Sequence, residues 1–404
     1  MAVGQCDFPA MPDITGIRLG TACAGIKQTV KDDILVIAMA EHATCAAVFT
    51  QNAFCAAPVH VAKANLPHAP RWLLVNSGNA NAGTGEQGMQ DALLSCAELA
   101  AVVGADANQV LPFSTGVIGM PLPIKKITTA LPDAVKNLSE ANWDKAARAI
   151  MTTDTFPKGV TKVITIAGQR ITINGIAKGA GMIQPNMATL LSFIATDAKI
   201  SQSLLQNCLA QAVEQSFNRI TVDGDTSTND ACVLMASDCS AAPEITEDSE
   251  HYPVFADAVM TVCKQLAETI IRDGEGATKL MRIVVKEALT DEEAVRVAKT
   301  IAHSPLVKTA FFASDPNWGR ILAAVGRSGV ENMVLEDVRI YLDDVCIVRN
   351  GGRDLDYTEE AGQQVMNNEE ISVTVILGRG NASQEVLTCD FSYDYVKINA
   401  EYRT

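Results

Sequence analysis

The sequence predicts an α+β fold rather than a doubly wound parallel sheet. Short apolar runs alternate with amphipathic helical stretches, and turns rich in Gly and Asn separate them. Several neighbouring runs are joined by very short connections, which suit antiparallel hairpins. The chain has 404 residues, enough for two or three domains with a well-buried core.

The first predicted unit is a strand, a loop and a helix. Residues 72–75 (WLLV) form an apolar run that stops at Asn76, and a helical pattern begins near Glu86. One face of that helix is predicted to carry Met89, Leu93, Cys96, Ala100 and Val103. A second amphipathic helix is predicted over 201–217, with a buried face of Leu205, Cys208, Leu209, Ala212 and Val213.

A hairpin is predicted between these two helices. The runs 163–166 (VITI) and 171–173 (ITI) flank the turn residues Ala167-Gly168-Gln169. The second strand runs directly into a glycine-rich segment around Lys178, so that lysine is expected at a strand end.

A second unit is predicted to begin near residue 281. Residues 281–286 form a strand, and the next helix opens with a capping box of Thr290 and Glu293. A hairpin follows, with strands 338–342 and 345–348. Two late strands alternate apolar and polar residues over 371–377 and 387–395. We therefore predict a domain of residues 1–280 and a smaller C-terminal α+β domain of residues 281–404.

Charge and composition exclude several classes of protein. The formal net charge of −15 argues against nucleic-acid binding, which needs a basic face. No apolar run approaches the roughly 18 residues of a membrane span, and the N-terminus lacks the features of a secretory signal. The 11 cysteines are scattered singly and the 5 histidines form no metal pair, so reduced thiols and no metal site are expected. We predict a cytoplasmic protein.

The segment GIAKGAGMIQPNMATLLSFIATD (175–197) carries the chemistry, because Thr189 heads an apolar run after the lysine loop. A threonine hydroxyl needs a base to act as a nucleophile, and no histidine lies near Thr189 in the sequence. A free N-terminal amine, which titrates at about 7.7–8.0, can serve as that base. The chain would expose one by cutting its own Ala188–Thr189 bond. On the residues alone, a threonine ahead of Leu190, Leu191 and Phe193 is more often a helix N-cap or a core-edge hydroxyl than a nucleophile.

The string KGAGMIQPNMATLLSFIATDA resembles the signature of the ornithine acetyltransferase family, the ArgJ proteins of arginine biosynthesis. Further blocks that resemble the family are VNSGNANAGTGEQG, STGVIG, AIMTTDTFPK, NRITVDGDTSTND, GEGATKL, SDPNWGRI and the terminal INAEYRT. The resemblance implies transfer of acetyl from N2-acetyl-L-ornithine to L-glutamate through an acetyl ester on Thr189. It also implies self-cleavage between Ala188 and Thr189.

The resemblance further implies an architecture and an assembly. The fold would be the layered αββα type shared with self-processing aminopeptidases, spanning the cut. The α chain 1–188 and the β chain 189–404 would stay associated as an α2β2 heterotetramer. No metal and no bound cofactor are implied. Some family members take acetyl only from N-acetylornithine, and others also use acetyl-CoA as a substrate. No motif in this sequence shows to which of these two kinds the chain belongs.

Site residues carry over from the family one by one. Thr115 (hydroxyl) and Gly116 (backbone N–H) are the implied oxyanion hole, which acyl transfer requires. The implied substrate contacts are Thr153, Lys178, Thr189, Glu275, Asn399 and the terminal Thr404. Thr155 is an alternative to Thr153, since both hydroxyls lie in one short stretch. The C-terminal tail would have to fold back over the site.

Two other functions are open on the sequence. An aminopeptidase or amidase on the same fold would give its acyl group to water instead of to glutamate. A nucleotide-binding protein would use the loop 78–88, although that loop lacks the lysine of a P-loop. Asp223, Asp225 and Asp230 are spaced for a cation site but do not match an EF-hand, so a turn network near the active site is expected.

Overall fold

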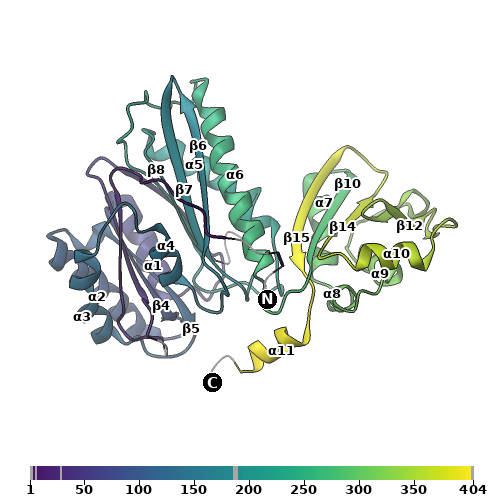
Figure 1. The fold of residues 1–404 in the computed structure, drawn as a ribbon, viewed down its shortest axis with the longest axis horizontal. Coiled ribbons are helices and arrows are strands. Elements are labelled where there is room, and N and C mark those ends of the chain that lie inside the picture. The colour runs from purple at the N-terminus through teal and green to yellow at the C-terminus, as the bar shows by residue number, and fades with distance from the viewer. Residues whose placement is uncertain (1–2, 5–6, 28–29, 185–189, 402–404) are drawn as a thin grey trace.

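The computed structural model describes residues 3–4, 7–27, 30–184 and 190–401. They form a larger unit with two stacked sheets and a smaller unit with a third sheet (Figure 1). The sheets mix parallel and antiparallel neighbours, so the predicted α+β class is confirmed. No helix in the described part of the chain is long and apolar enough to cross a membrane.

The larger unit contains a four-stranded and a five-stranded sheet. The first has the order β1 (Ile17–Ala22), β2 (Ile34–Met39), β4 (Trp72–Asn79), β5 (Val110–Val117). The second has the order β3 (Thr44–Phe49), β9 (Ala231–Ala236), β8 (Leu191–Thr196), β7 (Gln169–Lys178), β6 (Lys158–Ile166). Only β4–β5 and β8–β9 are parallel pairs among these strands.

The two sheets pack face to face. Alternate residues of β8 point to opposite faces, so Phe193 enters the layer between the sheets and Ile194 the opposite layer. The rings of Phe113 and Phe193 meet edge to face with centroids 5.3 Å apart. Helix α4 (Trp143–Ile150) adds the buried Trp143 to the same layer. Both sheets are therefore buried on their facing sides.

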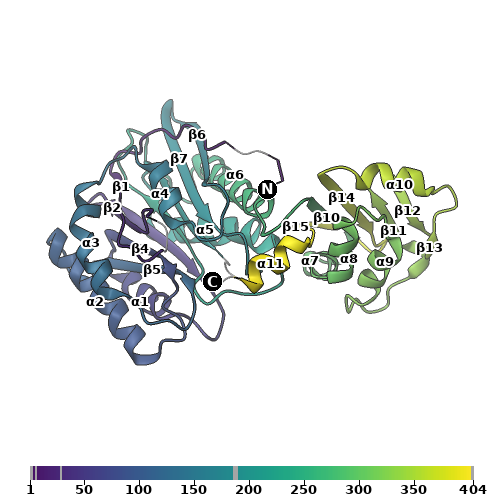
Figure 2. The same cartoon turned by 60° about the horizontal axis from the view of Figure 1, so that its bottom comes forward.

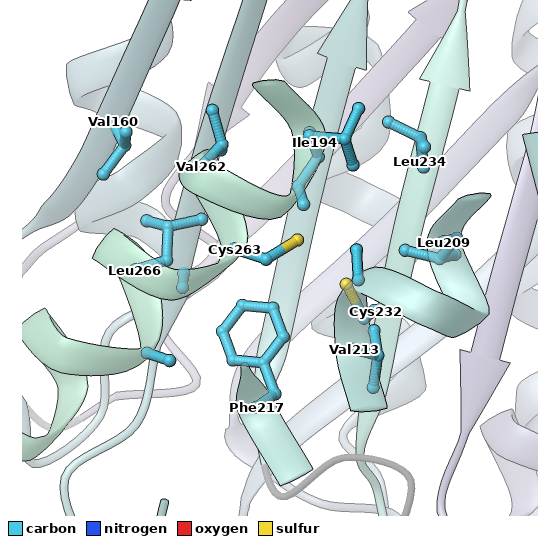
Figure 3. Packing of buried hydrophobic residues seen from close by; sticks show 14 of the residues in the cluster. Val160, Ile194, Leu209, Val213, Phe217, Cys232, Leu234, Val262, Cys263 and Leu266 are labelled. Atoms are coloured by element: carbon cyan, nitrogen blue, oxygen red, sulfur yellow. The ribbon is translucent and has the colours of Figure 1, made fainter. Parts of the chain in front are cut away.

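Helices cover the outer face of each sheet. α1 (Ala57–Asn65), α2 (Gly85–Val103) and α3 (Ile124–Lys136) share a core with the four-stranded sheet. α5 (Gln202–Glu214) and α6 (His251–Arg272) cover the five-stranded sheet, and Figure 3 shows Cys263 and Leu266 of α6 facing strand residues such as Ile194. The order helix, sheet, sheet, helix is the implied αββα arrangement.

The smaller unit is built on a six-stranded sheet. Its order is β13 (Gly352–Arg353), β12 (Val345–Arg349), β11 (Arg339–Leu342), β14 (Glu370–Ile376), β10 (Leu280–Ala288), β15 (Ala382–Cys389). Its helices are α7 (Asp291–Ala302), α8 (Pro305–Phe312), α9 (Trp318–Gly326) and α10 (Glu359–Met366). This sheet has its own buried cluster, which includes Ile283 and Val373.

Several predicted elements are confirmed with small shifts at their ends. Ile166 of β6 pairs with Gln169 of β7, and the turn between them has positive φ at Ala167 and Gly168. α5 buries the predicted face, and the Thr290 side chain accepts the Glu293 N–H at the start of α7. β4 is longer than predicted because it continues to Asn79.

Two predictions about helices and strands are wrong. Leu93 is 52% exposed, and the buried stripe of α2 runs through Ala92, Cys96 and Leu99 instead. Residues 92–94 are all apolar and lie at neighbouring positions around the helix, so the spacing of apolar residues alone does not show which face is buried. The strand predicted over 387–395 ends at Cys389. The Ser392 side chain accepts the N–H of Asp394 and starts α11 (Tyr393–Ala400), which places Tyr393 and Tyr395 on a helix.

Helix α11 returns from the smaller unit to the larger one (Figure 2). Ser392 Oγ donates to the carbonyl oxygen of Gly276 at 2.6 Å, near the end of α6. Gly276 has a φ of +70°, and a Cβ on it would lie 2.5 Å from the backbone nitrogen of Tyr395. A side chain at position 276 would therefore push the C-terminal helix away from the larger unit.

Candidate active site

A pocket of about 270 Å³ lies where several predicted residues meet. Its walls include Thr115, Gly116, Thr153, Lys178, Glu275 and Asn399, which come from five separate segments of the chain. Ala188, Thr189 and Thr404 lie outside the described residues. Met182 and Leu190, which stand on either side of residues 185–189, line the same pocket. Several predicted site residues therefore share one pocket with described residues from both sides of that segment.

The end of β5 places Thr115 and Gly116 against β4. Gly116 has a φ of +134°, and a Cβ on it would lie 2.3 Å from the carbonyl carbon of Gly78. Only glycine can hold this backbone so close to its neighbouring strand. The preceding residue is fixed as well, since Ser114 Oγ donates to Asn76 Oδ1 at 2.6 Å.

Asn229 braces the same strand end from another loop. Its Nδ2 donates to the carbonyl oxygens of Ala80 at 2.6 Å and Ser114 at 3.0 Å. It is 6% exposed and lines the pocket together with the buried Asp230. Asn229 is not among the predicted site residues, although it lies in the family-like block 218–230. The loop before β9 thus holds the backbone beside Thr115 and Gly116 in place.

Lys178 lies at the end of β7 and reaches across to β5. Its Nζ donates to Thr115 Oγ1 at 3.2 Å. Burial lowers the pKa of Lys178, against the opposing effect of the carboxylates of Asp154, Asp230 and Glu275. An ammonium group can only donate, so the Thr115 oxygen accepts and its own proton can be given to an acceptor in the pocket.

A buried ion network holds the loop that follows Lys178. Lys158 Nζ lies 2.6 Å from both Asp154 Oδ1 and Asp273 Oδ2, and all three side chains are buried. The N–H of Gly179 donates to Asp154 Oδ1 at 2.7 Å. Burial alone would raise the pKa of Asp154, but the ammonium groups of Lys158 and Lys178 hold it well below its usual value. No local pattern in the sequence predicts this network, because Asp273 lies 115 positions from Lys158.

The network also distinguishes Thr153 from Thr155 as candidate substrate contacts. Thr155 donates its N–H to Asp273 Oδ2 at 3.0 Å, and its hydroxyl bonds to Asp273 Oδ1. Thr153 lines the pocket, whereas Thr155 does not. The geometry therefore favours Thr153 as the substrate contact.

Glu275 lies against the glycine loop with its carboxylate facing the pocket. It is 6% exposed, and its N–H donates to the carbonyl oxygen of Ala180 at 2.8 Å. A Cβ on Gly181 would lie 2.2 Å from Glu275 Oε2, so this glycine is needed for the close approach. Asn399 Nδ2 of α11 donates to the same Oε2 at 2.8 Å. Through this bond α11 contacts the wall of the pocket.

Asp223 holds the chain just before residues 185–189. Its carboxylate accepts the N–H of Met182 at 2.6 Å and of Ile183 at 2.9 Å, and the Tyr395 hydroxyl donates to it at 3.4 Å. On the other side of the segment, the carbonyl oxygen of Leu190 accepts the N–H of Ala231 at 2.9 Å. Asp223 thus belongs to a turn network, as expected. Within the described ranges, no group of three or more His, Cys, Asp or Glu side chains is placed to hold a metal ion.

The chain is similar to known proteins along nearly its whole length. The model of the ArgJ family matches residues 18–404. The arginine biosynthesis bifunctional protein ArgJ of Methylococcus capsulatus is 64% identical over 391 residues, covering 97% of this chain and 96% of the relative. The protein of the same name from Pseudomonas fluorescens is 53% identical over 405 residues and covers 100% of each. A crystal structure of ArgJ from Bacillus halodurans has a TM-score of 0.51 and 41% identity, covering 53% of this chain and 100% of that chain.

Proposed function

The chain belongs to the ArgJ family, acetyltransferases of arginine biosynthesis, and from this premise we propose that it moves an acetyl group from N2-acetyl-L-ornithine to L-glutamate. The observation that carries the proposal is the shared pocket. Thr115, Gly116, Thr153, Lys178, Glu275 and Asn399 line it together with Met182 and Leu190. The residues implied for acyl transfer thus surround the two ends of the segment that holds Thr189.

We propose that Thr189 first cuts its own chain. Its hydroxyl attacks the carbonyl carbon of Ala188, the peptide bond shifts to an ester, and water hydrolyses the ester to leave a free amine on Thr189. Both ends of the segment are anchored, at Ile183 by Asp223 and at Leu190 by Ala231. A cut there leaves 189–404 as the larger fragment, just over half of the chain. The solved Bacillus halodurans chain is covered over 100% of its length and matches 53% of this chain. That share agrees with the length of the proposed larger fragment.

Acetyl transfer then uses the same hydroxyl in two steps. The Thr189 amine takes the hydroxyl proton while the oxygen attacks the acetyl carbonyl, and the amide C–N bond breaks as ornithine leaves with that proton. The acetyl ester on Thr189 is then attacked by the amine of glutamate, which releases N-acetylglutamate and restores the hydroxyl. Each step passes through a tetrahedral oxyanion. Thr115 and Gly116 are the donors for it, and the Lys178 ammonium strengthens the Thr115 hydroxyl as a donor.

Glu275 is the partner for the cationic side chain of ornithine. The Glu275 carboxylate is 6% exposed at the pocket wall, and a bound ammonium group would give it a charge-assisted hydrogen bond. A ligand with a neutral side chain would not supply that bond. Asn399 keeps Oε2 of Glu275 oriented, and Thr153 contributes a hydroxyl on the same wall. We assign Thr404 to the same substrate site, because Asn399, which precedes it by five positions, lines the pocket.

Assaying the purified enzyme with N-acetylornithine, with and without glutamate, tests this function. With glutamate, ornithine and N-acetylglutamate should appear in equal amounts over many turnovers. Without it, ornithine release should stop near one equivalent per site, since the acetyl group stays on Thr189. If acetate release outpaced acetylglutamate formation, the enzyme would be a hydrolase on the same fold and this proposal would be wrong.

The remaining assignments follow from the same premise. We propose an α2β2 assembly of the two fragments in the cytoplasm, with a self-processing domain of residues 1–280 and a C-terminal domain of residues 281–404. No resident cofactor takes part, since threonine, its amine and the oxyanion donors complete the transfer. Acetyl-CoA would act as a second acetyl donor. The relatives' description as bifunctional supports that role.

A further inference from the structure

A second pocket, of about 370 Å³, adjoins the candidate active site. Thr152 lines both pockets. Four basic side chains line the second one, namely Lys27, Lys31, Lys145 and Arg148. In a chain with a formal net charge of −15, such a concentration of positive charge at one pocket is unusual and implies an anionic occupant.

The positive charge of this pocket is poorly balanced by its surroundings. Among the described residues, none of its three lysines has a carboxylate oxygen within 4.0 Å. Arg148 contacts Asp144 through Nε, and its two terminal nitrogens make no hydrogen bond to the described chain. The lining acid Asp154 is already paired with Lys158. The other, Asp32, accepts the Thr21 hydroxyl at 2.5 Å.

Lys27 is held in place by backbone carbonyl groups and forms no ion pair within 4.0 Å with a described carboxylate. Its Nζ donates to the carbonyl oxygens of Ala149 at 3.0 Å and Asp32 at 3.2 Å. Burial lowers the pKa of Lys27 to about 8, against the opposing effect of Asp33. A bound anion would favour the charged ammonium, so the lysine is positioned for a ligand rather than for a partner within the chain.

We propose that this basic pocket binds the phosphate groups of an acetyl donor of the coenzyme A class, whose acetyl end enters the adjoining site beside Thr115. The inference rests on the proposed acetyl-threonine function. Neither N-acetylornithine nor glutamate carries a phosphate, so the reaction between them leaves this pocket unused. In the added step the Thr189 oxygen attacks the thioester carbonyl and the C–S bond breaks. The departing thiolate takes the proton that the Thr189 amine removed from the hydroxyl.

The test compares two donors in one pair of variants. Lys31 and Lys145 are exposed, so the double variant K31Q/K145Q removes two positive charges without opening a core. The control K136Q/K162Q removes two other exposed lysines, which line neither pocket. We expect KM for acetyl-CoA to rise about tenfold or more in K31Q/K145Q, about 1.4 kcal/mol of binding free energy. The kcat/KM for N-acetylornithine should stay within about twofold in both variants.

Direct binding separates failure of the pocket from failure of the proposed function. In calorimetry, free coenzyme A should bind to the wild type and to the control with the same affinity, and to K31Q/K145Q about tenfold more weakly. Inorganic phosphate should bind to the wild type far more weakly than coenzyme A does. Equal affinity of coenzyme A for all three proteins, or no binding, would overturn the inference while leaving N-acetylornithine turnover intact. Equal losses with both donors would also overturn it. Absence of N-acetylornithine turnover in the wild type would instead overturn the proposed function.

Discussion

Lys178 Nζ lies 3.2 Å from Thr115 Oγ1 and so joins the ends of two strands from different sheets. β7 belongs to the five-stranded sheet and β5 to the four-stranded one. The two sheets that form the layers of the larger unit therefore meet at this contact, at the wall of the pocket. The stacking of the sheets thus fixes the distance between a positive charge and the hydroxyl proposed as an oxyanion donor.

Removing the Thr115 hydroxyl should slow chemistry more than it weakens binding. Thr115→Val keeps the shape of the side chain but deletes the donor, so kcat should fall by about 10²–10³ with a small change in KM. Thr115→Ser keeps a hydroxyl within reach of Lys178 and should retain most of the activity. Steady-state kinetics of both variants checks this, and equal kcat for Val and Ser would exclude the hydroxyl from the oxyanion hole.

Neutralising Glu275 should act mainly on the ornithine-bearing substrate. Glu275→Gln removes the negative charge, and the loss of one charged hydrogen bond, about 1.5–3 kcal/mol, should raise KM for N-acetylornithine by about tenfold to a hundredfold. Glutamate has no cationic side chain, so its KM should change less. Glu244→Gln, at an exposed position, is the control and should match the wild type. Equal increases in both KM values would contradict the assignment.

Asp223 should control the rate of self-cleavage rather than the fold. Asp223→Ala leaves the N–H groups of Met182 and Ile183 without their acceptor, at a cost of about 1–3 kcal/mol. We expect cleavage to slow by about tenfold or more, followed as fragment formation on a denaturing gel after synthesis. Asp225→Ala, two residues away and exposed, should cleave at the wild-type rate. Cleavage at the same rate in both variants would remove Asp223 from this role.

His303 should make the protein less stable in mild acid. Burial, together with the nearby charges of Lys299, Lys308 and Arg327, lowers its pKa to about 4. The unfolded chain binds the proton near pH 6.5 and the folded one only near pH 4. The contribution of neutral His303 to the free energy of unfolding is therefore fully present above pH 6.5 and is lost as the pH drops toward 4. His303→Gln should flatten that slope in denaturant titrations, whereas the exposed His42→Gln should not.

Sequence motifs singled out several of the residues that line the pocket, whereas the contacts that hold them together join distant parts of the chain. Thr115, Gly116, Lys178 and Glu275 could be named because each lies in a short block that resembles the family. The buried Lys158–Asp273 pair joins residues 115 positions apart, and no local pattern reports such a contact. Asn229 was missed for the same reason, since its acceptor on Ser114 also lies 115 positions away.

Near Ser392 the sequence carries two conflicting signals, one for a strand and one for a helix start. The alternation from Leu387 to Tyr395 fits a strand, but Ser392 caps a helix within it, and this helix carries Asn399 to the pocket. The return of the C-terminal segment was expected from the family resemblance, and its helical form was not. The hairpin ending at Lys178 was predicted because the turn Ala167-Gly168 and the apolar periodicity of both strands agree.

The role of Thr189 is tested most directly by the mass of the purified protein after incubation with N-acetylornithine in the absence of glutamate. We expect two fragments in the wild type, with Thr189 as the new N-terminus. The larger fragment should carry one acetyl group, and that group should disappear when glutamate is added. Thr189→Ala should remain one inactive chain, and Thr189→Ser should cleave more slowly and still take up the acetyl group. An intact wild-type chain that transfers acetyl, or an acetyl group bound elsewhere than Thr189, would contradict the central claim.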